Sequence, residues 1–394
     1  MKNKKILCFD IEGGHGGSSR SLFYSIENIA KEKPNEIDIT VICRRKSWIQ
    51  HEYKKIGINC YINKNIPRFT PLIKISRNIY QIIFFLIYLW PKSKKLRNKI
   101  KLMNNFDVLH FNHISLSLLA LWCKFHRIGK SRVMHLRTLP PRNIFSKVLL
   151  HIAIKSCNSL IYITENEKTH LHSLIGKPNI YEKVIYNPIS SQQKINKNFL
   201  KNENRFKIGL LSNFSYNRGV DRILEIYEAI PFKKRKNFVF VLAGDMKLEK
   251  NIPNIPNHFF KKNKNFSDFI KSKGYENNFI FLGQLEKPEN LINKIHVLIK
   301  PTRLNNPWGR DILEALSMGK PVISVGFYKK FVETNKTGLL QKKFNAKEIA
   351  NLIIKLEKNR SLLKRLSLEC KKRVKILCNP KTVSEKLLKV WLNR

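Results

Sequence analysis

Short apolar runs alternate with helical patterns along most of the chain, and this alternation constrains the fold more than any other feature. In the first half the apolar runs are residues 6–10, 37–43, 107–112, 131–136, 159–164 and 183–189. In the second half they are residues 206–213, 238–245, 278–284, 296–301 and 321–326. Runs of this length, separated by amphipathic stretches such as 20–31, are typical of βαβ units and parallel sheets. The sequence therefore predicts an α/β protein.

A polar stretch, residues 190–205, separates the two series and contains few large apolar side chains. We predict a first domain over residues 1–190, a linker over 191–205 and a second domain over 206–375. The pattern from Ala346 onward is helical and is interrupted at Asn379–Pro380, so we expect residues 376–394 to form a helix that crosses back to the first domain. Ligands of such sheets bind beyond the carboxyl ends of the strands, here in the cleft expected between the two halves.

The chain is strongly basic, with 75 Lys and Arg against 28 Asp and Glu and a net charge of +47. This excess favours nucleic acid, an anionic membrane surface or phosphorylated ligands as partners, and a merely solvated basic surface is the alternative. Basic repeats interleaved with aromatics are absent, so we expect no specific nucleic-acid partner. The seven cysteines are widely spaced without a C-x-x-C motif, and the N-terminal apolar run ends at Asp10, which is typical of a cytoplasmic protein.

One segment resembles a membrane-surface element. Residues 78–91 carry no charge, and six Lys or Arg follow between Lys92 and Lys101 without an acidic residue. The apolar run is shorter than the roughly 20 residues that span a bilayer. The basic residues that follow it suit an element lying in the interface of an anionic membrane. We expect residues 78–101 to contact a membrane surface; a buried helix followed by a basic loop is the alternative.

A glycine-rich loop, residues 12–19, separates the first strand from the first helix. Glycines such as Gly16 and Gly17 let a backbone approach a ligand closely, and the start of a helix presents unpaired N–H groups, so the loop favours anion binding. The spacing matches neither a Walker-type loop nor G-x-G-x-x-G, and a simple tight turn is the alternative. The scattered histidines and carboxylates indicate no metal site.

A more informative segment runs from Pro301 to Ile323. A strand ends at Pro301, a loop passes through Gly309, and a helix extends to about Ser317 before Gly319 and Pro321. Glu314 lies among apolar helix residues, where a carboxylate needs hydrogen-bond donors. Ribose hydroxyls would supply them, and a partly exposed helix carboxylate is the alternative.

This segment, NPWGRDILEALSMGKPVIS, resembles the signature of family 4 glycosyltransferases. Other resemblances follow in order along nearly the whole chain: GGHGGSSRSL, DVLH, LIYITENEK, VIYNPI, SNFSYNRGVDRIL, VLAGD, FLGQ and KTGLL. The resemblance implies the GT-B architecture, in which two Rossmann-like α/β/α domains face each other across a cleft. It also implies a transferase that takes a sugar from a nucleotide-sugar donor with retention at the anomeric carbon.

The resemblance assigns donor-binding residues to both halves of the chain. The cation pair that holds the donor diphosphate aligns with Asn213 and Arg218, and only Arg218 keeps the charge. The family's first signature carboxylate, which contacts the donor sugar, is Asn306 here, and Glu314 is expected to hold the ribose. The full donor-binding set is Gly16, Gly17, Asn213, Arg218, Asn306, Pro307, Trp308, Gly309, Arg310 and Glu314.

In the first half the resemblance points to histidines at strand ends. His110 ends the DVLH strand, and the family's second histidine aligns with Asn112, so His113 is expected to substitute for it by a one-residue shift. We predict His110, His113 and Arg218 as catalytic residues, although each histidine alone also suits a packing role. His15, His135 and Arg137 are predicted to bind the acceptor.

These observations predict a glycosyltransferase with no cofactor beyond its substrate, a UDP- or GDP-sugar. The basic, apolar 78–101 segment suggests a lipid-linked or membrane-embedded saccharide as acceptor, in lipopolysaccharide, O-antigen or capsule synthesis at the inner face of the cytoplasmic membrane. Two alternatives remain open: a non-catalytic protein that binds nucleic acid or anionic membrane, and a soluble transferase of glucan or sucrose-type metabolism.

Overall fold

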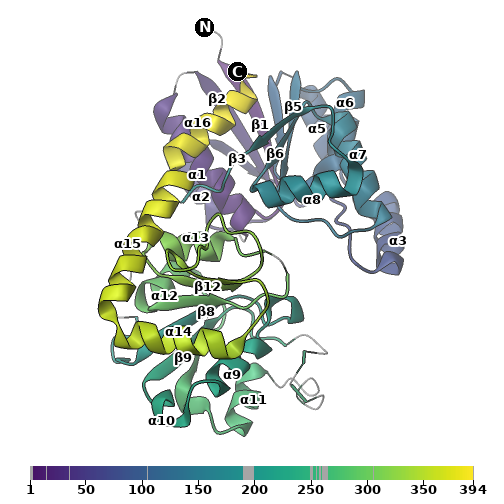
Figure 1. Ribbon diagram of the computed structural model, residues 1–394. Coiled ribbons are helices and arrows are strands. Elements are labelled where there is room, and N and C mark those ends of the chain that lie inside the picture. The colour runs from purple at the N-terminus through teal and green to yellow at the C-terminus, as the bar shows by residue number, and fades with distance from the viewer. Residues whose placement is uncertain are drawn as a thin grey trace. The chain divides into compact units, whose positions relative to one another are not determined.

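The computed structural model divides the chain into two compact units (Figure 1). Unit 1 comprises Met1–Pro188 and Cys378–Arg394, and unit 2 comprises Ile189–Leu377. The structure describes residues 3–14, 16–34, 36–103, 105–189, 199–248, 252–253, 255–256, 259, 265–304 and 306–393. Of the expected linker, residues 191–198 lie outside the described residues.

Unit 1 is built on a parallel sheet whose strand order is β3-β2-β1-β4-β5-β6-β7. Every pairing in it is parallel. The strands are β1 (Lys4–Asp10), β2 (Ile37–Cys43), β3 (Asn59–Ile62), β4 (Val108–Phe111), β5 (Ser131–Leu136), β6 (Ser159–Tyr162) and β7 (Tyr181–Val184).

Helices cover both faces of this sheet, as the near-continuous apolar strands require. Side chains alternate along β1: Ile6 and Cys8 join the core on one face, and Leu7 and Phe9 join the core on the other. The helices are α1 (Gly17–Glu32), α2 (Ile49–Lys55), α3 (Ile75–Phe84), the π-helical turn η1 (Phe85–Leu89), α4 (Trp90–Lys92), α5 (Lys94–Leu102), the 3₁₀ turn η2 (Ile114–Leu116), α6 (Ser117–Phe125), α7 (Ile144–Ser156) and α8 (Glu165–Ile175).

The last helix of the chain, α16 (Pro380–Trp391), belongs to unit 1. It packs along α1, as Figure 1 shows in yellow against purple. Its apolar residues Val383, Leu387, Val390 and Trp391 are buried in the same core as β1 and β2. The chain therefore returns to its first unit after completing the second.

Unit 2 repeats the same plan with a sheet of order β10-β9-β8-β11-β12-β13. Its strands are β8 (Phe206–Leu211), β9 (Phe238–Ala243), β10 (Phe279–Phe281), β11 (Val297–Lys300), β12 (Val322–Val325) and β13 (Gly338–Gln341). Its helices are η3 (Tyr216–Arg218, 3₁₀), α9 (Asp221–Glu228), α10 (Phe232–Arg235), α11 (Phe266–Ser272), η5 (Glu276–Asn278, 3₁₀), α12 (Pro288–Lys294), α13 (Arg310–Ser317), α14 (Ala346–Lys358) and α15 (Arg360–Leu377).

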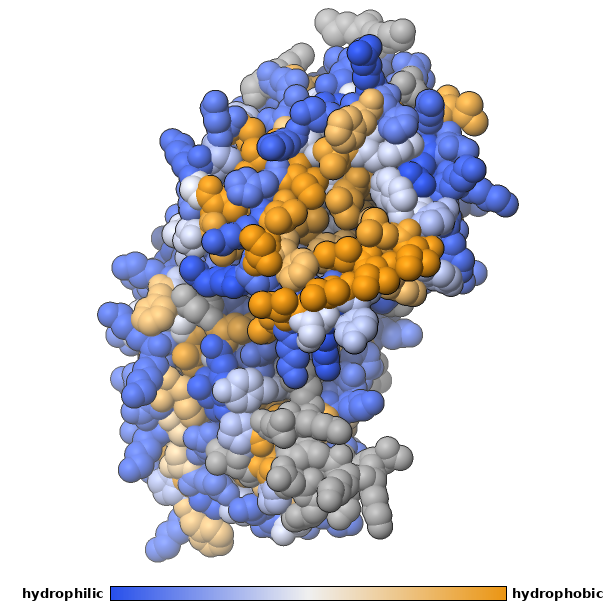
Figure 2. All heavy atoms as spheres, turned by 90° about the vertical axis from the view of Figure 1, so that its right-hand side faces the viewer, coloured by the Kyte–Doolittle hydropathy of each residue, from blue (hydrophilic) through white to orange (hydrophobic). Residues whose placement is uncertain are grey.

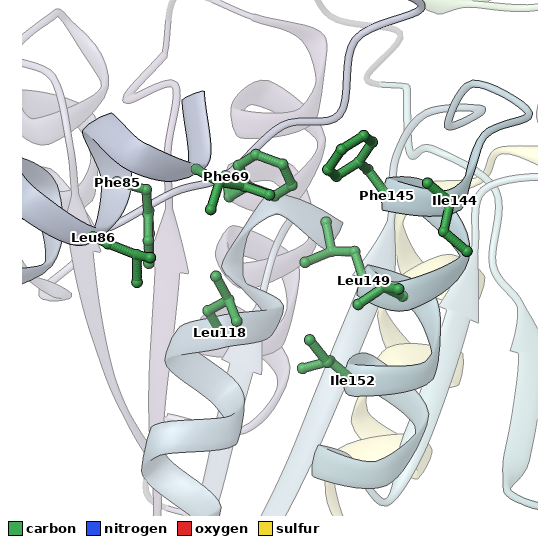
Figure 3. Close-up of a pocket in the computed structure, with 10 residues that line it drawn as sticks. Phe69, Phe85, Leu86, Leu118, Ile144, Phe145, Leu149 and Ile152 are labelled. Carbon is green, nitrogen blue, oxygen red and sulfur yellow. The ribbon is translucent and has the colours of Figure 1, made fainter. Parts of the chain in front are cut away.

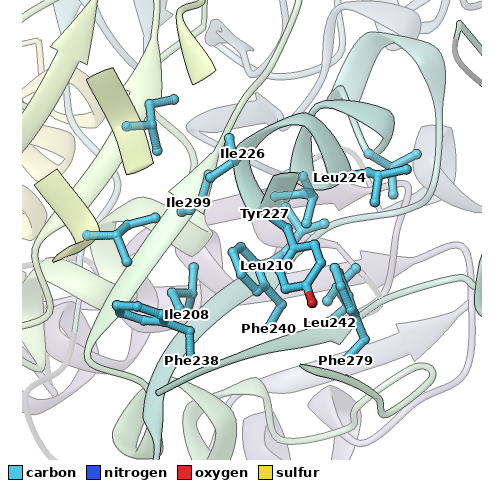
Figure 4. Close-up of a cluster of buried hydrophobic side chains, with 14 of the residues drawn as sticks. Ile208, Leu210, Leu224, Ile226, Tyr227, Phe238, Phe240, Leu242, Phe279 and Ile299 are labelled. Carbon is cyan, nitrogen blue, oxygen red and sulfur yellow. The ribbon is translucent and has the colours of Figure 1, made fainter. Parts of the chain in front are cut away.

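Aromatic side chains form much of the core on one face of the second sheet (Figure 4). Tyr227 of α9 meets Phe240 and Phe279 edge-on, with ring centroids 5.9 and 5.2 Å apart. Phe240 and Phe279, on neighbouring strands, stack at 5.3 Å. Such pairs add to the free energy of burial and hold α9 at a fixed place on the sheet, close to the loop that follows β8.

Three strands differ from the sequence-based expectation, and one of them is the edge strand β13 (Gly338–Gln341), which lies in none of the apolar runs. The apolar runs missed β3, an edge strand whose four residues are mostly exposed and which therefore lacks an apolar pattern. The run at 183–189 places β7 too late, because the strand covers Tyr181–Val184 and the chain leaves the sheet before Pro188. The α/β prediction itself is confirmed for both units.

Candidate functional site

The strand order of unit 2 marks one place on the sheet where loops diverge. β9 and β10 extend the sheet to one side of β8, whereas β11, β12 and β13 extend it to the other. The loops after β8 and β11 therefore leave in opposite directions at the carboxyl edge. Such a switch point is where doubly wound sheets bind their ligands. The predicted donor residues Asn213 and Arg218 lie in the first loop, and Asn306 to Arg310 lie in the second.

Several contacts tie these two loops together. Gly219 has a φ of 70° and lies so close to the second loop that a Cβ there would be 2.1 Å from the Pro301 carbonyl oxygen. Arg222 donates to the carbonyls of Pro301 and Thr302, both at 3.0 Å. Arg303 clamps the buried Asp221 with two bonds, of 2.9 and 2.6 Å. The loop positions are thus fixed by the chain itself, which prepares the site before any ligand arrives.

Lys300 is a further candidate site residue, which the sequence motifs do not indicate. It is the last residue of β11 and only 5% exposed, and its Nζ donates to the Trp308 carbonyl at 2.7 Å and to Asp311 Oδ1 at 3.0 Å. Burial and the nearby charge of Arg218 lower the pKa of the ammonium, while Asp311 opposes that shift. The available signal was a lysine that ends an otherwise apolar strand, directly before Pro301.

Arg218 ends the 3₁₀ turn η3 and is half-buried. Within the described ranges, no hydrogen bond or ion pair of its guanidinium is found, although its charge acts on Lys300. A planar guanidinium in this state offers several donors to a phosphate group. Arg218 and Lys300 together bring two cations to the switch point of unit 2.

Glu314, predicted to hold a ribose, lies on α13 and is 3% exposed. Its Oε1 accepts a hydrogen bond from Arg310 Nε at 2.7 Å, one helical turn earlier, and both side chains are buried. The hydrogen-bond donor that the buried carboxylate requires is therefore supplied within the helix. The sequence predicts ribose hydroxyls in this place and Arg310 as a separate donor-binding residue.

The remaining predicted residues of this loop have structural contacts. The Asn306 side-chain oxygen lies 3.0 Å from the Thr302 hydroxyl, and the Asn213 side chain accepts from the Asp245 N–H at 3.3 Å. Pro307 is buried, and Trp308 is 6% exposed and packs edge-on against Tyr328 at 5.3 Å. Gly309, with a φ of 138°, leaves room for Lys300, since a Cβ would lie 2.7 Å from its Nζ.

Unit 1 has its own switch point, between β1 and β4, and the glycine loop follows β1. Asp10, buried at the end of β1, accepts hydrogen bonds from the N–H groups of Glu12 and Gly13, at 3.1 and 3.2 Å, and from the Ser19 hydroxyl. Burial raises the pKa of this carboxyl. Asp10 thus holds the loop, a role that its sequence position alone did not indicate.

The glycines of this loop allow a close backbone approach. At Gly16, the N-cap of α1, a Cβ would lie 1.8 Å from a Glu12 carboxylate oxygen, and no side chain caps the helix. Gly17 begins the helix. The predicted acceptor residue His15 lies outside the described residues.

An amide–guanidinium cluster follows β4 and β5 in unit 1. The Asn112 side-chain oxygen accepts from Arg137 Nε at 2.9 Å and Nη2 at 2.7 Å, and Arg137 Nη1 donates to Asn187 at 2.7 Å. Asn112 also donates to the Ser18 carbonyl at 3.3 Å. Arg137, predicted to bind the acceptor, is 8% exposed and connects three strand ends of the sheet instead of projecting from it.

His113 caps the 3₁₀ turn η2. Its Nδ1 accepts from the Ser115 N–H at 3.1 Å, and the residue is 7% exposed. Burial, together with the positive charges of Arg68 and Arg137, lowers its pKa to about 4. The ring is neutral at neutral pH, and besides the Nδ1 contact its Nε2 lies 3.5 Å from the Thr138 hydroxyl.

His110 and His135 belong to the core of unit 1. They are 0% and 3% exposed, their rings meet edge-on at 5.4 Å, and His110 Nδ1 accepts from Trp391 Nε1 at 3.1 Å. Burial lowers both pKa values, that of His110 to about 3. This burial suits the packing role that the sequence left open, and the catalytic role of His110 and the acceptor-binding role of His135 stay predictions.

Two features are absent from the described residues. No cluster of three or more His, Cys, Asp or Glu side chains in the described ranges is arranged to hold a metal ion. Among the helices that the structure describes, none combines the length and apolarity needed to cross a membrane.

Comparison with known proteins agrees with this architecture. Residues 191–373 match the family model of glycosyl transferases group 1. The crystal structure of HepE from Anabaena with UDP and glucose is 18% identical and superposes with a TM-score of 0.76, covering 100% of both chains. Sucrose-phosphate synthase from Thermosynechococcus elongatus is 13% identical with a TM-score of 0.73, covering 99% of both.

The chain is also similar in sequence to a protein from Klebsiella pneumoniae. An uncharacterized 42.6 kDa protein in the cps region of Klebsiella pneumoniae is 22% identical over 335 residues, 78% of this chain and 81% of that protein. The similar structures share the GT-B architecture, so the expected fold is confirmed. The match to glycosyl transferases group 1 thus covers residues 191–373, and the similar structures show the fold of the whole chain, with two Rossmann-like units.

Proposed function

We propose that the protein is a retaining glycosyltransferase of the family 4 type. It would transfer a sugar from a UDP- or GDP-sugar to a lipid-linked or membrane-embedded saccharide during the synthesis of a cell-surface polysaccharide such as lipopolysaccharide, O-antigen or capsule. The nucleotide sugar is a substrate, and the proposal includes no further cofactor.

One observation carries the proposal for the donor. Arg218 and Lys300 bring two positive charges to the switch point of unit 2, on loops that Arg222 and Arg303 hold in place. A nucleoside diphosphate carries its charge on adjacent phosphates, which paired cations recognise. The solved structure of HepE, similar in fold, contains UDP and glucose.

The same cations would support the chemistry. As the glycosidic bond to the donor breaks, negative charge develops on the departing diphosphate. Fixed cations stabilise that charge without rearranging, and this is the largest contribution expected from the protein. Glu314 would hold the ribose by exchanging part of its contact with Arg310, and Asn306 would contact the sugar through its amide.

The acceptor proposal rests on the surface of unit 1. Apolar side chains between Ile73 and Tyr88 are exposed and are followed by five exposed lysines between Lys92 and Lys101. This surface suits an anionic leaflet, where the protein would work as a peripheral protein on the cytoplasmic side. The relative from the cps region of Klebsiella pneumoniae favours polysaccharide synthesis over sugar metabolism in solution.

A transfer assay tests the proposal. The purified chain is incubated with radiolabelled UDP-sugars and GDP-sugars and with bacterial membranes, and the label is followed into material that dissolves in organic solvent. We expect transfer from one of these donors, with the anomeric configuration retained when the product is examined by NMR. Arg218→Ala should lower kcat/KM at least about tenfold, because it removes a charge-assisted contact with the diphosphate.

Other results would contradict specific parts of the proposal. If the label stays on the nucleotide sugar for every donor tested, the proposal that the protein transfers a sugar is contradicted. A labelled product that stays in water and forms without membranes would instead indicate a soluble transferase. An inverted product would contradict the retaining mechanism.

A further inference from the structure

An apolar pocket in unit 1 has no role in the donor site. It has a volume of about 370 Å³. Figure 3 shows its side chains converging from the π-helical turn, from α6 and from α7, with Phe69 between them. All the lining residues are apolar: Phe69, Ile82, Phe85, Leu86, Leu118, Ile144, Phe145, Val148, Leu149 and Ile152.

The walls of this pocket are fixed by polar contacts at one point. The buried Asn78 of α3 accepts from the Leu72 N–H and donates to the Leu72 carbonyl, both at 2.7 Å. Asn143, the N-cap of α7, donates to the same carbonyl at 2.7 Å. The two helices that face each other across the pocket are therefore tied to one residue, and the cavity is formed without a ligand.

The π-helical turn η1 shapes the opposite wall. Pro91 follows it and has no N–H, so a regular α-helix would lose a hydrogen bond here and its ring would clash with the preceding turn. A π turn accommodates this and is frequent at functional sites. It leaves Phe85 4% exposed inside the pocket and Leu86 58% exposed at its mouth.

The mouth of the pocket opens onto a wide apolar surface, visible in orange in the upper half of Figure 2. Besides Leu86, the lining residues Ile144 and Val148 are 58% and 50% exposed. Further side chains that are about half or more exposed continue the surface along α3 and η1: Ile73, Ile75, Ile79, Tyr80, Ile83, Phe84, Ile87 and Tyr88. Apolar patches of this extent mark interaction sites with a membrane or a partner.

Charge identifies the occupant. The sequence from Tyr53 to Phe106 contains no Asp or Glu, and the exposed lysines of α5 follow the apolar surface directly. Lys92 lies 4.0 Å from the centre of the Tyr88 ring, and Arg97 lies 4.0 Å from that of Trp90. Amphipathic aromatics beside cations are typical of the level of lipid headgroups. An anionic lipid surface matches both the apolar and the basic part.

We infer that the pocket receives one hydrocarbon chain of a phospholipid from the anionic bilayer on which unit 1 lies. A group the size of a water molecule or a methylene occupies ~30 Å³. The cavity therefore holds about ten such groups. A chain that enters from the bilayer also covers the exposed rims of Leu86, Ile144 and Val148. This inference rests on the proposed membrane contact and adds a defined lipid site to it.

Photochemical crosslinking tests the inference. The full chain is bound to vesicles of phosphatidylcholine and phosphatidylglycerol in which some phosphatidylcholine carries a diazirine in the middle of an acyl chain, and the adducts are mapped by mass spectrometry. We expect adducts on the lining residues Leu118, which is half-buried, and Leu149, which is buried. Adducts confined to exposed residues such as Ile73 and Ile87 would overturn the inference.

Two variants separate pocket occupancy from membrane binding. Val148→Glu places a charge at the mouth on a half-exposed position and should lower lining adducts at least about tenfold; Leu86→Asn is a second, milder change with the same expected direction. Leu368→Glu, at a 60% exposed position of α15, is the matched control and should change nothing. Lining adducts that persist in both mouth variants would overturn the inference.

Sedimentation with the same vesicles reports the membrane contact independently. Replacing Lys92, Lys94 and Lys95 by alanine should reduce sedimentation, and the fraction still bound should keep its lining adducts. If the wild-type chain sediments but gives no lining adducts, the pocket proposal fails and the membrane contact stands. If an excess of unlabelled bacterial lipid extract abolishes the lining adducts and an equal excess of unlabelled synthetic phospholipid does not, the occupant is a different lipid and the inference is wrong.

Discussion

At the scale of single residues, the buried histidines of unit 1 link its stability to pH. His113 has a pKa of about 4 in the folded chain, lowered mainly by burial, against roughly 6.5 in an unfolded chain. Below pH 6.5 the unfolded chain therefore binds a proton that the folded chain does not. The free energy of unfolding falls as the pH drops from 6.5 towards 4, by roughly 3 kcal/mol from this group, and the group contributes no pH dependence above that window.

We predict that His113→Asn weakens this pH dependence. Asparagine can still accept the Ser115 N–H as a cap but does not titrate. Urea unfolding of both proteins at pH 7 and pH 4.5 measures the difference, and the variant should lose about 2 kcal/mol less between the two values. His110 and His135 titrate equally in both proteins and cancel. An identical loss in the two proteins would show that His113 is not the group responsible.

The residue scale is also where sequence reasoning was least complete. The family signature located the loop from Pro301 to Gly309 and the helix that carries Glu314, because motif and spacing are visible in a sequence. It did not reveal Lys300 or Asp10, whose roles depend on which backbone groups the fold brings within hydrogen-bond distance. It also did not reveal the hydrogen bond between Trp391 and His110, because a contact across 281 residues cannot be read from local sequence.

At the scale of elements, helix α13 combines a structural ion pair with a proposed ligand contact. Arg310→Leu removes one partner and leaves the Glu314 carboxylate buried without it. We predict a loss of roughly 3–5 kcal/mol in the stability of unit 2, since breaking one side of a buried pair is strongly destabilising. Urea unfolding measures this loss. Replacing both residues by leucine should restore most of it, because two apolar side chains of similar size need no partner.

The double variant also separates structure from binding. If Glu314 holds the ribose, the restored protein should still bind nucleotide at least about tenfold more weakly than the wild type. Wild-type nucleotide affinity in the stable double variant would reduce the role of Glu314 to that of an ion-pair partner.

The segment from Ile75 to Leu102 shows what patterns predict at this scale. The uncharged run and the lysines after it were evident in the sequence, and the structure exposes both. The π-helical turn before Pro91 was not predicted, since proline in an apolar run more often ends a helix than changes its hydrogen-bond spacing. The pocket also required α7, which lies about sixty residues further along the chain.

At the scale of the whole molecule, unit 1 is completed by the last helix of the chain. Removing residues 378–394 would expose the apolar face of α1 and remove the buried Trp391. We predict that this truncation lowers the stability of unit 1 while unit 2 keeps its own. Differential scanning calorimetry combined with limited proteolysis distinguishes the units, and cleavage should concentrate in residues 3–188. If unit 1 resists proteolysis equally well with and without the helix, the prediction is contradicted.

Both sheets follow the same strand order from their first strand outward, and the alternation of apolar runs anticipated this plan. An alternating pattern of apolar runs and helices is enough to predict this plan, because right-handed crossovers and parallel pairing leave few possible arrangements of the strands. The precise loop contacts at each switch point arise from packing between distant segments, as between Gly219 and Pro301, and no local pattern contains them.

Calorimetric titration of the full chain with UDP and with GDP tests the central claim most directly, namely that the strand ends of unit 2 bind a nucleoside diphosphate through Arg218 and Lys300. Lys320→Met is the control, since Lys320 is half-buried but precedes β12, at the opposite edge of the sheet. The account predicts one site for one of the two nucleotides, at least about tenfold weaker in Arg218→Ala and in Lys300→Met and unchanged in Lys320→Met. Binding of neither nucleotide, or full affinity in both site variants, would contradict it.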